Sequence, residues 1–372
     1  MNSIKNIFKK LNKYIPIPAM IFYIFFIIAG SIHLISLISK GFSDFFNENI
    51  SAFFRMLSAK ATNLLPFSLA ELIVMFLPVI VIVIFIITFK YVKSIIRYLT
   101  LMLSVVTLFY TLFVFNFAAG YRGSTLEEKL ELNRTDISIG ELYDTAEFLL
   151  KKASEYASEI NYIYSTHSVM PFTLDEMNVY LNEACLKTSE KYKFFAKLKS
   201  NVKFVLLSDL MNYTHISGVY TYYTGEANLN ISFPDYKLPF TAAHELSHQR
   251  GIAREDEANF MAFLICLESG EPYILYSAYV NIFEYVSNAL YDADKQLYLN
   301  LLNRMDYRIR CELIAYNNFF KKYEGSVASS ISGAINDTFL KSQGQSDGRQ
   351  SYGRVVDLAV AYYRSNANGY KK

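Results

Sequence analysis

Three long runs without charged residues dominate the first third of the chain, over residues 15–39, 72–89 and 98–121. A helix rises about 1.5 Å per residue, so about 20 residues cross the hydrocarbon layer of a membrane. Each run reaches or approaches that length. Core helices of soluble proteins rarely lack charge for so long, and the first run is too long for a signal peptide. We therefore expect an amino-terminal bundle of three transmembrane helices.

Basic residues flank these runs unevenly, which predicts an orientation. They cluster at the amino end and in the short turn between the second and third runs: Lys5, Lys9, Lys10, Lys13, Lys90, Lys93 and Arg97. The loop over residues 40–71 carries Lys40, Arg55 and Lys60 across a longer stretch. Positively charged loops stay in the cytoplasm. We expect a multi-pass protein of the cell membrane, with a membrane domain over residues 1–121 and an extracytoplasmic domain over residues 122–372.

The pattern after residue 121 indicates a mostly helical domain. Ser138 with Glu141, and Thr173 with Glu176, form two capping boxes, each ahead of a helical pattern. Helical periodicity returns from the stretch that begins at Thr241 and continues to about Phe320. A Gly/Ser-rich region follows, and residues 352–365 predict a last helix.

Two segments have the composition of strands. Residues 202–207 read as a short strand, and residues 218–233 are rich in Tyr, Thr and Ile, as an exposed or edge strand would be. Helices with a small sheet predict the α+β class.

Composition excludes several functions. The chain has 372 residues and a net charge of +2, so it has no basic bias toward nucleic acid. Its three cysteines, Cys185, Cys266 and Cys311, show no CxxC spacing, which excludes a cysteine-type zinc knuckle. We expect them to be small buried apolar residues.

One short segment concentrates polar chemistry. His244, Glu245 and His248 form the HExxH pattern, and two of the five histidines of the chain fall at this spacing. Positions i and i+4 share a helix face, so both imidazoles can reach one ion. Such a pattern also arises as the solvated face of an ordinary helix. Here a helix break and an acidic second helix follow directly, which favours a zinc site with Glu245 as general base.

A third ligand is expected from the next helix. Gly251 suits a helix end, and a second helical run begins at about Arg254. Glu255 would lie in its first turn, with Asn259 four residues later on the same face, placed to hydrogen-bond a ligand histidine. Glu257 is the competing ligand. We prefer Glu255, which gives a zinc site of His244, His248 and Glu255.

Arg254 replaces the third histidine of the longer HExxHxxGxxH pattern, and arginine cannot bind a metal. A glutamate ligand is therefore expected. Charged residues crowd this segment, among them Arg250, Asp256 and Glu257. Hydrocarbon would not tolerate them, so we place the site in water.

Several segments resemble a bacterial family with a domain of unknown function. They are "GVYTYYTGEANLN", "LPFTAAHELSHQRGIAREDEANFMAF" and "GRQSYGRVVDLAVAYY". Members of that family pair amino-terminal membrane spans with a zincin-like HExxH domain. The segment "REDEANF" is also similar to the glutamate helix of gluzincin peptidases, which implies Glu255 as the ligand. Asn259 stands where aspartate is commoner in that motif.

The resemblance implies a membrane-anchored zinc metallopeptidase that acts on peptides or proteins. A substrate would lie along an edge strand above the HExxH helix, and "GVYTYYTGEANLN" is the best candidate for that strand. Tyr276 and Tyr279 are candidates for oxyanion stabilisation by residue type only, and we favour packing in the aromatic core for each of them.

The alternative to an enzyme is a zinc-stabilised membrane sensor or assembly factor without hydrolysis. Such a protein would have no need of a general base, and the presence of Glu245 favours the enzyme. A transporter fits poorly, because the spans show neither a repeat nor a charged residue. The sequence leaves the substrate and the oligomeric state open.

Overall fold

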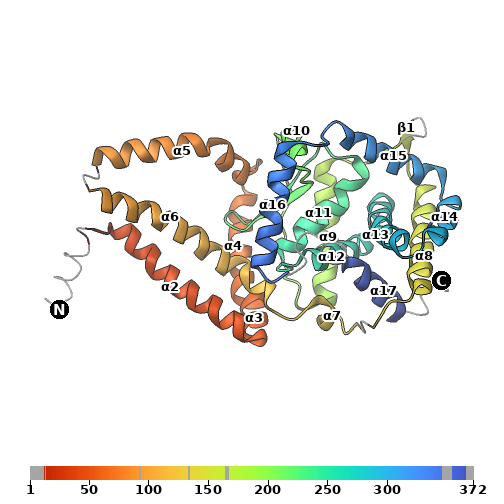
Figure 1. The fold of residues 1–372 in the computed structure, drawn as a ribbon, viewed down its shortest axis with the longest axis horizontal. Coiled ribbons are helices and arrows are strands. Elements are labelled where there is room, and N and C mark those ends of the chain that lie inside the picture. The colour runs from red at the N-terminus through yellow and green to blue at the C-terminus, as the bar shows by residue number, and fades with distance from the viewer. Residues whose placement is uncertain are drawn as a thin grey trace. The chain divides into compact units, whose positions relative to one another are not determined.

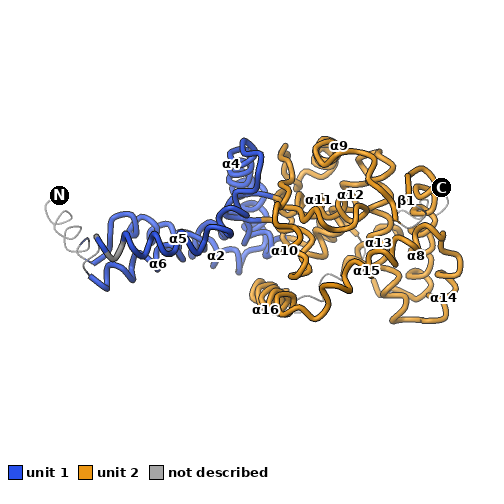
Figure 2. The backbone as a smooth tube through the Cα atoms, turned by 90° about the horizontal axis from the view of Figure 1, so that it is seen from above, with its two compact units in different colours: residues 1–123, 221–226 blue, residues 124–220, 227–372 orange. Residues whose placement is uncertain are grey.

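The computed structural model describes residue 12 and residues 14–91, 94–132, 135–163, 167–345 and 354–365. The basic residues Lys5, Lys9, Lys10, Lys13 and Lys93, and the first two residues of the expected last helix, lie outside these ranges. The chain forms two compact units, coloured separately in Figure 2. Unit 1 comprises residues 1–123 and 221–226, and unit 2 comprises residues 124–220 and 227–372.

The described residues of unit 1 before residue 124 are mostly helical (Figure 1). Its elements are α2 (Ile17–Ile38), α3 (Lys40–Phe45), the π-helix η1 (Phe46–Ser51), α4 (Ala52–Asn63), α5 (Leu69–Tyr91), α6 (Ile95–Asn116) and the 3-10 turn η2 (Ala118–Tyr121).

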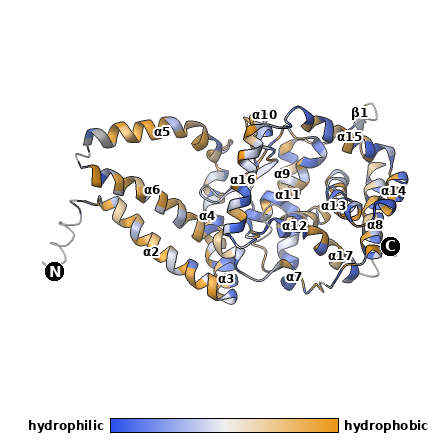
Figure 3. Ribbon diagram, viewed as in Figure 1, coloured by the Kyte–Doolittle hydropathy of each residue, from blue (hydrophilic) through white to orange (hydrophobic). Residues whose placement is uncertain are grey.

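Three of these helices are long and apolar enough to cross a membrane: α2, α5 over Leu69–Ile87, and α6. They are the strongly hydrophobic ribbons of Figure 3. In an apolar 18-residue window of each helix, only 11%, 6% and 28% of the residues are buried. The prediction of three candidate spans is thus confirmed by length and composition.

The connection between the first two spans is built around a buried arginine. Arg55 of α4 is 1% exposed and donates to the side chain and carbonyl of Asn47 at 2.9 and 2.8 Å. It also donates to the carbonyl of Asn116 at the end of α6, at 2.9 Å. Burying a guanidinium is costly unless its donors are satisfied. Arg55 therefore has a structural role, because it links Asn47 to the end of α6.

Residues 221–226 pack within unit 1, although they are distant from it in sequence. The ring of Tyr222 meets Phe113 edge-on at 5.4 Å, and the ring of Tyr223 meets Phe109 at 5.6 Å. Both phenylalanines lie in the last turns of α6. Aromatic side chains favour such edge-to-face contacts, and the segment is thereby attached to α6.

The same segment caps α5. The carboxylate of Glu226 accepts hydrogen bonds from the backbone N–H groups of Leu69 and Ala70, at 3.0 and 2.8 Å. These are the first residues of α5, whose N–H groups have no partner within the helix. Glu226 supplies that partner and places a negative charge at the positive end of the helix dipole.

Unit 2 is mostly helical, as predicted. Its helices are α7 (Leu126–Lys129), α8 (Ile139–Ala157), α9 (Leu174–Lys191), α10 (Ser208–Met211), α11 (Leu238–Gln249), α12 (Glu255–Leu267), α13 (Pro272–Ala293), α14 (Lys295–Asn303), α15 (Tyr307–Lys321), α16 (Val327–Ser342) and α17 (Val355–Ser365). The 3-10 turns η3 (Asn212–Thr214) and η4 (Asp235–Lys237) complete the set.

The core of unit 2 gathers around α12 and α13. Helix α13 packs along α8, while α11 and α12 pack against each other and against α13. The middle of α12 is wholly covered, because Phe260, Met261 and Phe263 are all 0% exposed. Burial of this kind holds the helix rigidly, and with it the first turn that carries Glu255.

Two small sheets accompany the helices. Strands β1 (Tyr162–Ile163) and β2 (His167–Ser168) pair antiparallel, and a second sheet has the order β3-β5-β4. In that sheet β3 (Lys203–Phe204) runs parallel to β5 (Glu226–Leu229), with Lys203 opposite Asn228. Strand β4 (Gly218–Thr221) lies at an edge.

The predicted strands are shorter than expected. The first covers two residues instead of the expected 202–207. The second, expected as one strand over 218–233, is a hairpin of β4 and β5 whose loop contains Gly225 at φ 73°. Glycine adopts this left-handed conformation without a steric penalty, so it ends the extended run.

Candidate metal centre

Helix α11 carries the HExxH residues in a fully enclosed position. Every residue of the helix, from Leu238 to Gln249, is buried. His244 and His248 are one turn apart, so their rings meet at 4.6 Å and their Nε2 atoms lie 3.0 Å apart. A buried pair of imidazoles that face each other is unlike the solvated face of an ordinary helix.

The chain turns back directly after α11 and brings a carboxylate to the histidines. Gly251 has φ 106°, which allows the reversal, and α12 begins at Glu255. Oε2 of Glu255 lies 3.2 Å from Nε2 of His244 and 3.4 Å from Nε2 of His248. The expected helix break and the position of Glu255 in the first turn are both observed.

The three side chains form a group that could hold a metal ion, and no other such group is found among the described residues. Tetrahedral zinc with ligands at about 2.0–2.2 Å separates neighbouring ligand atoms by about 3.3 Å. The observed separations of 3.0, 3.2 and 3.4 Å fit this spacing. Two imidazoles and one carboxylate are also a donor set that zinc accepts.

Electrostatics at the group favour a positive charge between the side chains. Burial lowers the pKa of His248, but the carboxylates of Glu255 and Glu245 outweigh it and raise that pKa to about 9. Burial also raises the pKa of Glu255, yet the facing imidazoles of His248 and His244 bring it well below its usual range. Glu255 is therefore ionised, as a ligand carboxylate must be.

The backbone orients one of the histidines. Nδ1 of His248 lies 2.7 Å from the carbonyl oxygen of Ile252, and this leaves Nε2 to face Glu255. A hydrogen bond at the second ring nitrogen is the usual support of a ligand histidine. The prediction that Asn259 hydrogen-bonds a ligand histidine is wrong. Nδ2 of Asn259 and Nδ1 of His244 are both buried without a hydrogen-bond partner.

Glu245 lies beside the group, against the edge strand β4. Burial raises its pKa, and Oε2 has no hydrogen-bond partner. A Cβ atom on Gly218 would come within 2.7 Å of both Cγ and Oε1 of Glu245. The backbone of Tyr220 also hydrogen-bonds the carboxylate. Strand β4 thus borders the candidate base, and only glycine leaves the room that this contact needs.

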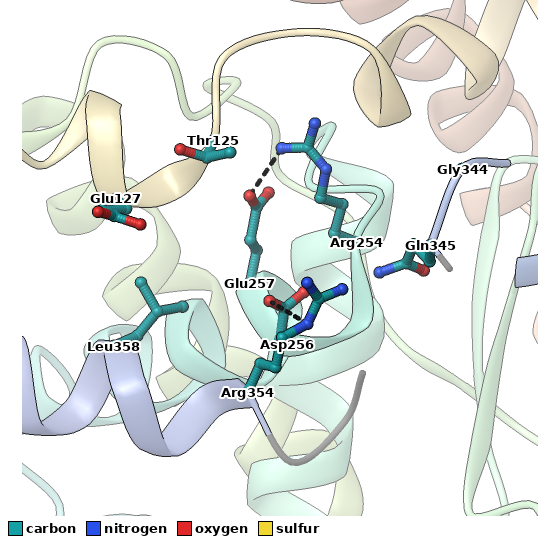
Figure 4. Close-up of a pocket in the computed structure, with 9 residues that line it drawn as sticks. All are labelled: Thr125, Glu127, Arg254, Asp256, Glu257, Gly344, Gln345, Arg354 and Leu358. Atoms are coloured by element: carbon teal, nitrogen blue, oxygen red, sulfur yellow. Dashed lines mark hydrogen bonds and ion pairs between the residues drawn. The ribbon is translucent and has the colours of Figure 1, made fainter. Parts of the chain in front are cut away.

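Glu257, the competing ligand, faces away from the histidines and holds α12 in place. Its Oε1 accepts from the backbone N–H of Leu126 and from Arg254, both at 2.9 Å. Figure 4 shows Glu257 and Arg254 at the wall of a cavity of about 160 Å³, which the Asp256–Arg354 pair also lines. The structure therefore brings Glu255, and not Glu257, to the histidines.

The two tyrosines proposed for the oxyanion are occupied elsewhere. The hydroxyl of Tyr276 donates to Oε2 of Glu312 at 3.2 Å, and Tyr276 is 0% exposed. Tyr279 stacks on Tyr156 at 5.8 Å. These contacts agree with the aromatic-core role that we favoured for both residues, and not with the alternative oxyanion role.

Two contacts at the group were missed by sequence reasoning. Gly218 carried no signal beyond its place at the start of a β-rich run, and the carbonyl of Ile252 could not be singled out from the backbone.

Arg250 was counted among charges in water, yet it is 0% exposed and donates to the carbonyls of Leu246 and Leu198 at 3.1 and 2.7 Å.

These features define a class: a mostly helical protein with three helices able to cross a membrane and a buried His-His-Glu group able to hold a metal. The chain belongs to the family described as "Protein of unknown function (DUF3810)", whose sequence profile matches residues 42–360. No curated protein and no solved structure matches the chain. The expected family of unknown function is thus confirmed, whereas its peptidase character stays a prediction.

Proposed function

We propose that the protein is a membrane-anchored zinc metallopeptidase, with His244, His248 and Glu255 as metal ligands and Glu245 as general base. The observation that carries this proposal is the convergence of three ligand atoms within 4.8 Å of one another, with a carboxylate on the residue next to one ligand. A site for structure alone would need a fourth ligand and no base.

Zinc bound at this group would polarise the scissile carbonyl and make a water molecule more acidic. In this proposal Glu245 takes the proton of that water and passes it to the leaving amine. Its carboxylate is shielded from solvent and has one oxygen without a protein partner. That free oxygen is the atom to which we assign the proton transfer.

Strand β4 is the proposed binding site for an extended substrate. It lies at an edge of its sheet, and an extended peptide can add to a sheet edge by main-chain pairing. Gly218 of this strand lies against Glu245. A peptide paired with β4 would therefore pass the proposed base Glu245 with its backbone held in an extended conformation.

Purified full-length protein provides the test. We expect about one zinc per chain by elemental analysis, and cleavage of a mixed peptide library detected by mass spectrometry. Glu245→Gln should retain the zinc, because the side chain is not a ligand, and should lose about 10²–10⁴-fold in rate. Loss of zinc in this variant would refute the role given to Glu245.

The alternative function, a zinc-stabilised sensor or assembly factor, predicts a different result. In that case Glu245→Gln would keep its metal and would restore growth as well as the wild-type protein in a deletion strain. Full complementation by this variant would therefore overturn the peptidase proposal.

A further inference from the structure

Strand β4, which borders Glu245 of the candidate site, continues directly into the segment 221–226 of unit 1. Gly218 borders Glu245, and only Val219 and Tyr220 separate it from Thr221, the first residue of the segment that packs in unit 1. The strand and the loop are one uninterrupted stretch of chain. Gly218, which contacts Glu245, is thus linked to unit 1 through only two intervening residues.

The loop is attached at the ends of two spans. Tyr222 and Tyr223 meet phenylalanine rings in the last turns of α6, and Glu226 caps the first turn of α5. The end of α6 and the start of α5 must lie at the same membrane surface, because each faces the loop. Tyrosine and phenylalanine rings are also characteristic of the membrane–water boundary.

Covalent geometry limits how far the candidate site can be from that surface. An extended chain covers at most about 3.3–3.6 Å per residue, so four residues from Gly218 to Tyr222 reach at most about 14 Å. The limit comes from bond lengths and holds for any arrangement of the two units. Substrates that need a large distance from the bilayer are therefore disfavoured.

We propose that the substrates are membrane-anchored polypeptides, cut in the extended segment directly outside the bilayer. This inference rests on the peptidase function proposed above. Hydrolysis breaks the C–N bond of one peptide unit, and water supplies the hydroxyl to the carbonyl carbon and a proton to the released amine. The membrane anchor of the substrate would remain in the bilayer.

A spacer series tests the inference with the full-length protein in liposomes. Each reporter carries one transmembrane helix followed by a spacer of mixed sequence, of about 5, 10, 20 or 40 residues, and a folded reporter domain. Cut positions are read by mass spectrometry, and Glu245→Gln protein gives the background. The same spacers without the anchor serve as soluble substrates.

We expect cleavage within about 10 residues of the bilayer, because about four residues reach Gly218 and a few more lie along β4. Cleavage confined to the spacers of about 20 and 40 residues would overturn the inference, since it requires a site farther from the membrane. Equal rates on anchored and soluble spacers would also overturn it. No cleavage above the Glu245→Gln background on any spacer would refute the peptidase function itself.

A second variant tests the loop. Tyr222→Ala combined with Tyr223→Ala removes both ring contacts with α6 but leaves Gly218 and Glu245 unchanged. We expect soluble spacers to be cut as before, while cuts on anchored spacers spread outward. Cut positions that stay unchanged on anchored spacers would show that the loop does not set the distance.

Discussion

Two glutamates of α12 that are two residues apart have opposite surroundings. Glu255 faces two imidazoles, whereas Glu257 accepts from Leu126 and Arg254. The difference follows from the helix, because residues two apart point to different sides. We therefore expect substitution of Glu255 and substitution of Glu257 to affect different properties of the protein.

Substitution of each glutamate should separate metal binding from stability. Glu255→Gln replaces an anionic ligand by a weak neutral one, so we expect zinc affinity to fall at least about 100-fold. Glu257→Gln should keep zinc affinity but lower the free energy of unfolding by about 1–3 kcal/mol, because a buried charged hydrogen bond is lost. Competition with a chromogenic chelator measures the first, and thermal unfolding measures the second. Loss of zinc in Glu257→Gln alone would reverse the assignment.

Gly218 offers a test of the contact between β4 and the base. In Gly218→Ala the added Cβ would come within 2.7 Å of the Glu245 side chain, so the carboxylate must shift. Displacement of a catalytic group by about 1 Å can cost about 100-fold in rate. We expect hydrolysis to fall toward that level with zinc content unchanged.

Gly140→Ala is the matched control, because the nearest atom to its added Cβ, Oγ of Ser138, is 4.0 Å away. This variant should hydrolyse peptide at the wild-type rate. Equal activity of both alanine variants would show that β4 does not constrain the base.

Sequence reasoning at this scale succeeded where the contacts are local. The i, i+4 spacing of His244 and His248, and a glutamate in the first turn of the next helix, are properties of neighbouring helical positions. Gly218 meets Glu245 only through the fold, and no local pattern encodes such a contact. For the same reason the roles of Tyr276 and Tyr279 could not be assigned from residue type, which does not tell where a buried ring points.

At the level of helices and strands, the capping boxes were the most reliable signals. Ser138 with Glu141, and Thr173 with Glu176, both form the reciprocal bonds that start α8 and α9. Such bonds depend on four consecutive residues and can be predicted from sequence. The prediction of a single strand over 218–233 was wrong, because the β-rich composition of this segment gave no sign of the turn at Gly225.

Glu141 links the start of α8 to α17 and predicts a pH dependence. Its pKa is lowered to about 2 by Arg364 and by the backbone and side chain of Ser138. An unfolded glutamate titrates near pH 4.3, so the ionised group stabilises the fold above about pH 4.5. That contribution is lost as the pH falls from there toward 2.

Glu141→Gln should therefore destabilise unit 2 at pH 7 by about 1 kcal/mol or less, as expected for an exposed cap and ion pair. Chemical unfolding of the variant and the wild-type protein at several pH values measures this difference. We expect it to shrink as the solution is acidified below about pH 4.5. A difference that stays constant down to pH 2.5 would contradict the role of the ionised carboxylate.

For the whole molecule, the sequence predicted three spans and their bounds to within a few residues, because hydrocarbon requires uninterrupted apolar length. It could not foresee that the loop 221–226 packs with unit 1, since this contact joins segments far apart in the chain. The burial of Arg55 was equally hidden.

The orientation expected from the sequence would place unit 2 outside the cytoplasm, and protease accessibility tests this expectation. Protease added to intact spheroplasts should remove the carboxyl-terminal domain and leave the spans protected. A cytoplasmic marker protein must survive the same treatment. If the domain is digested only after the membrane has been broken, the topology is the reverse.

The loop 221–226 also sets an order of events during synthesis. The spans leave the ribosome first, and the loop follows about 100 residues later, a delay of roughly 5–20 s at about 5–20 residues per second. During this time the first N–H groups of α5 lack Glu226 as their cap. The contacts of unit 1 can therefore form completely only after the hairpin of β4 and β5 has been synthesised. A fragment that ends at residue 123 would insert into the membrane as an unfinished assembly.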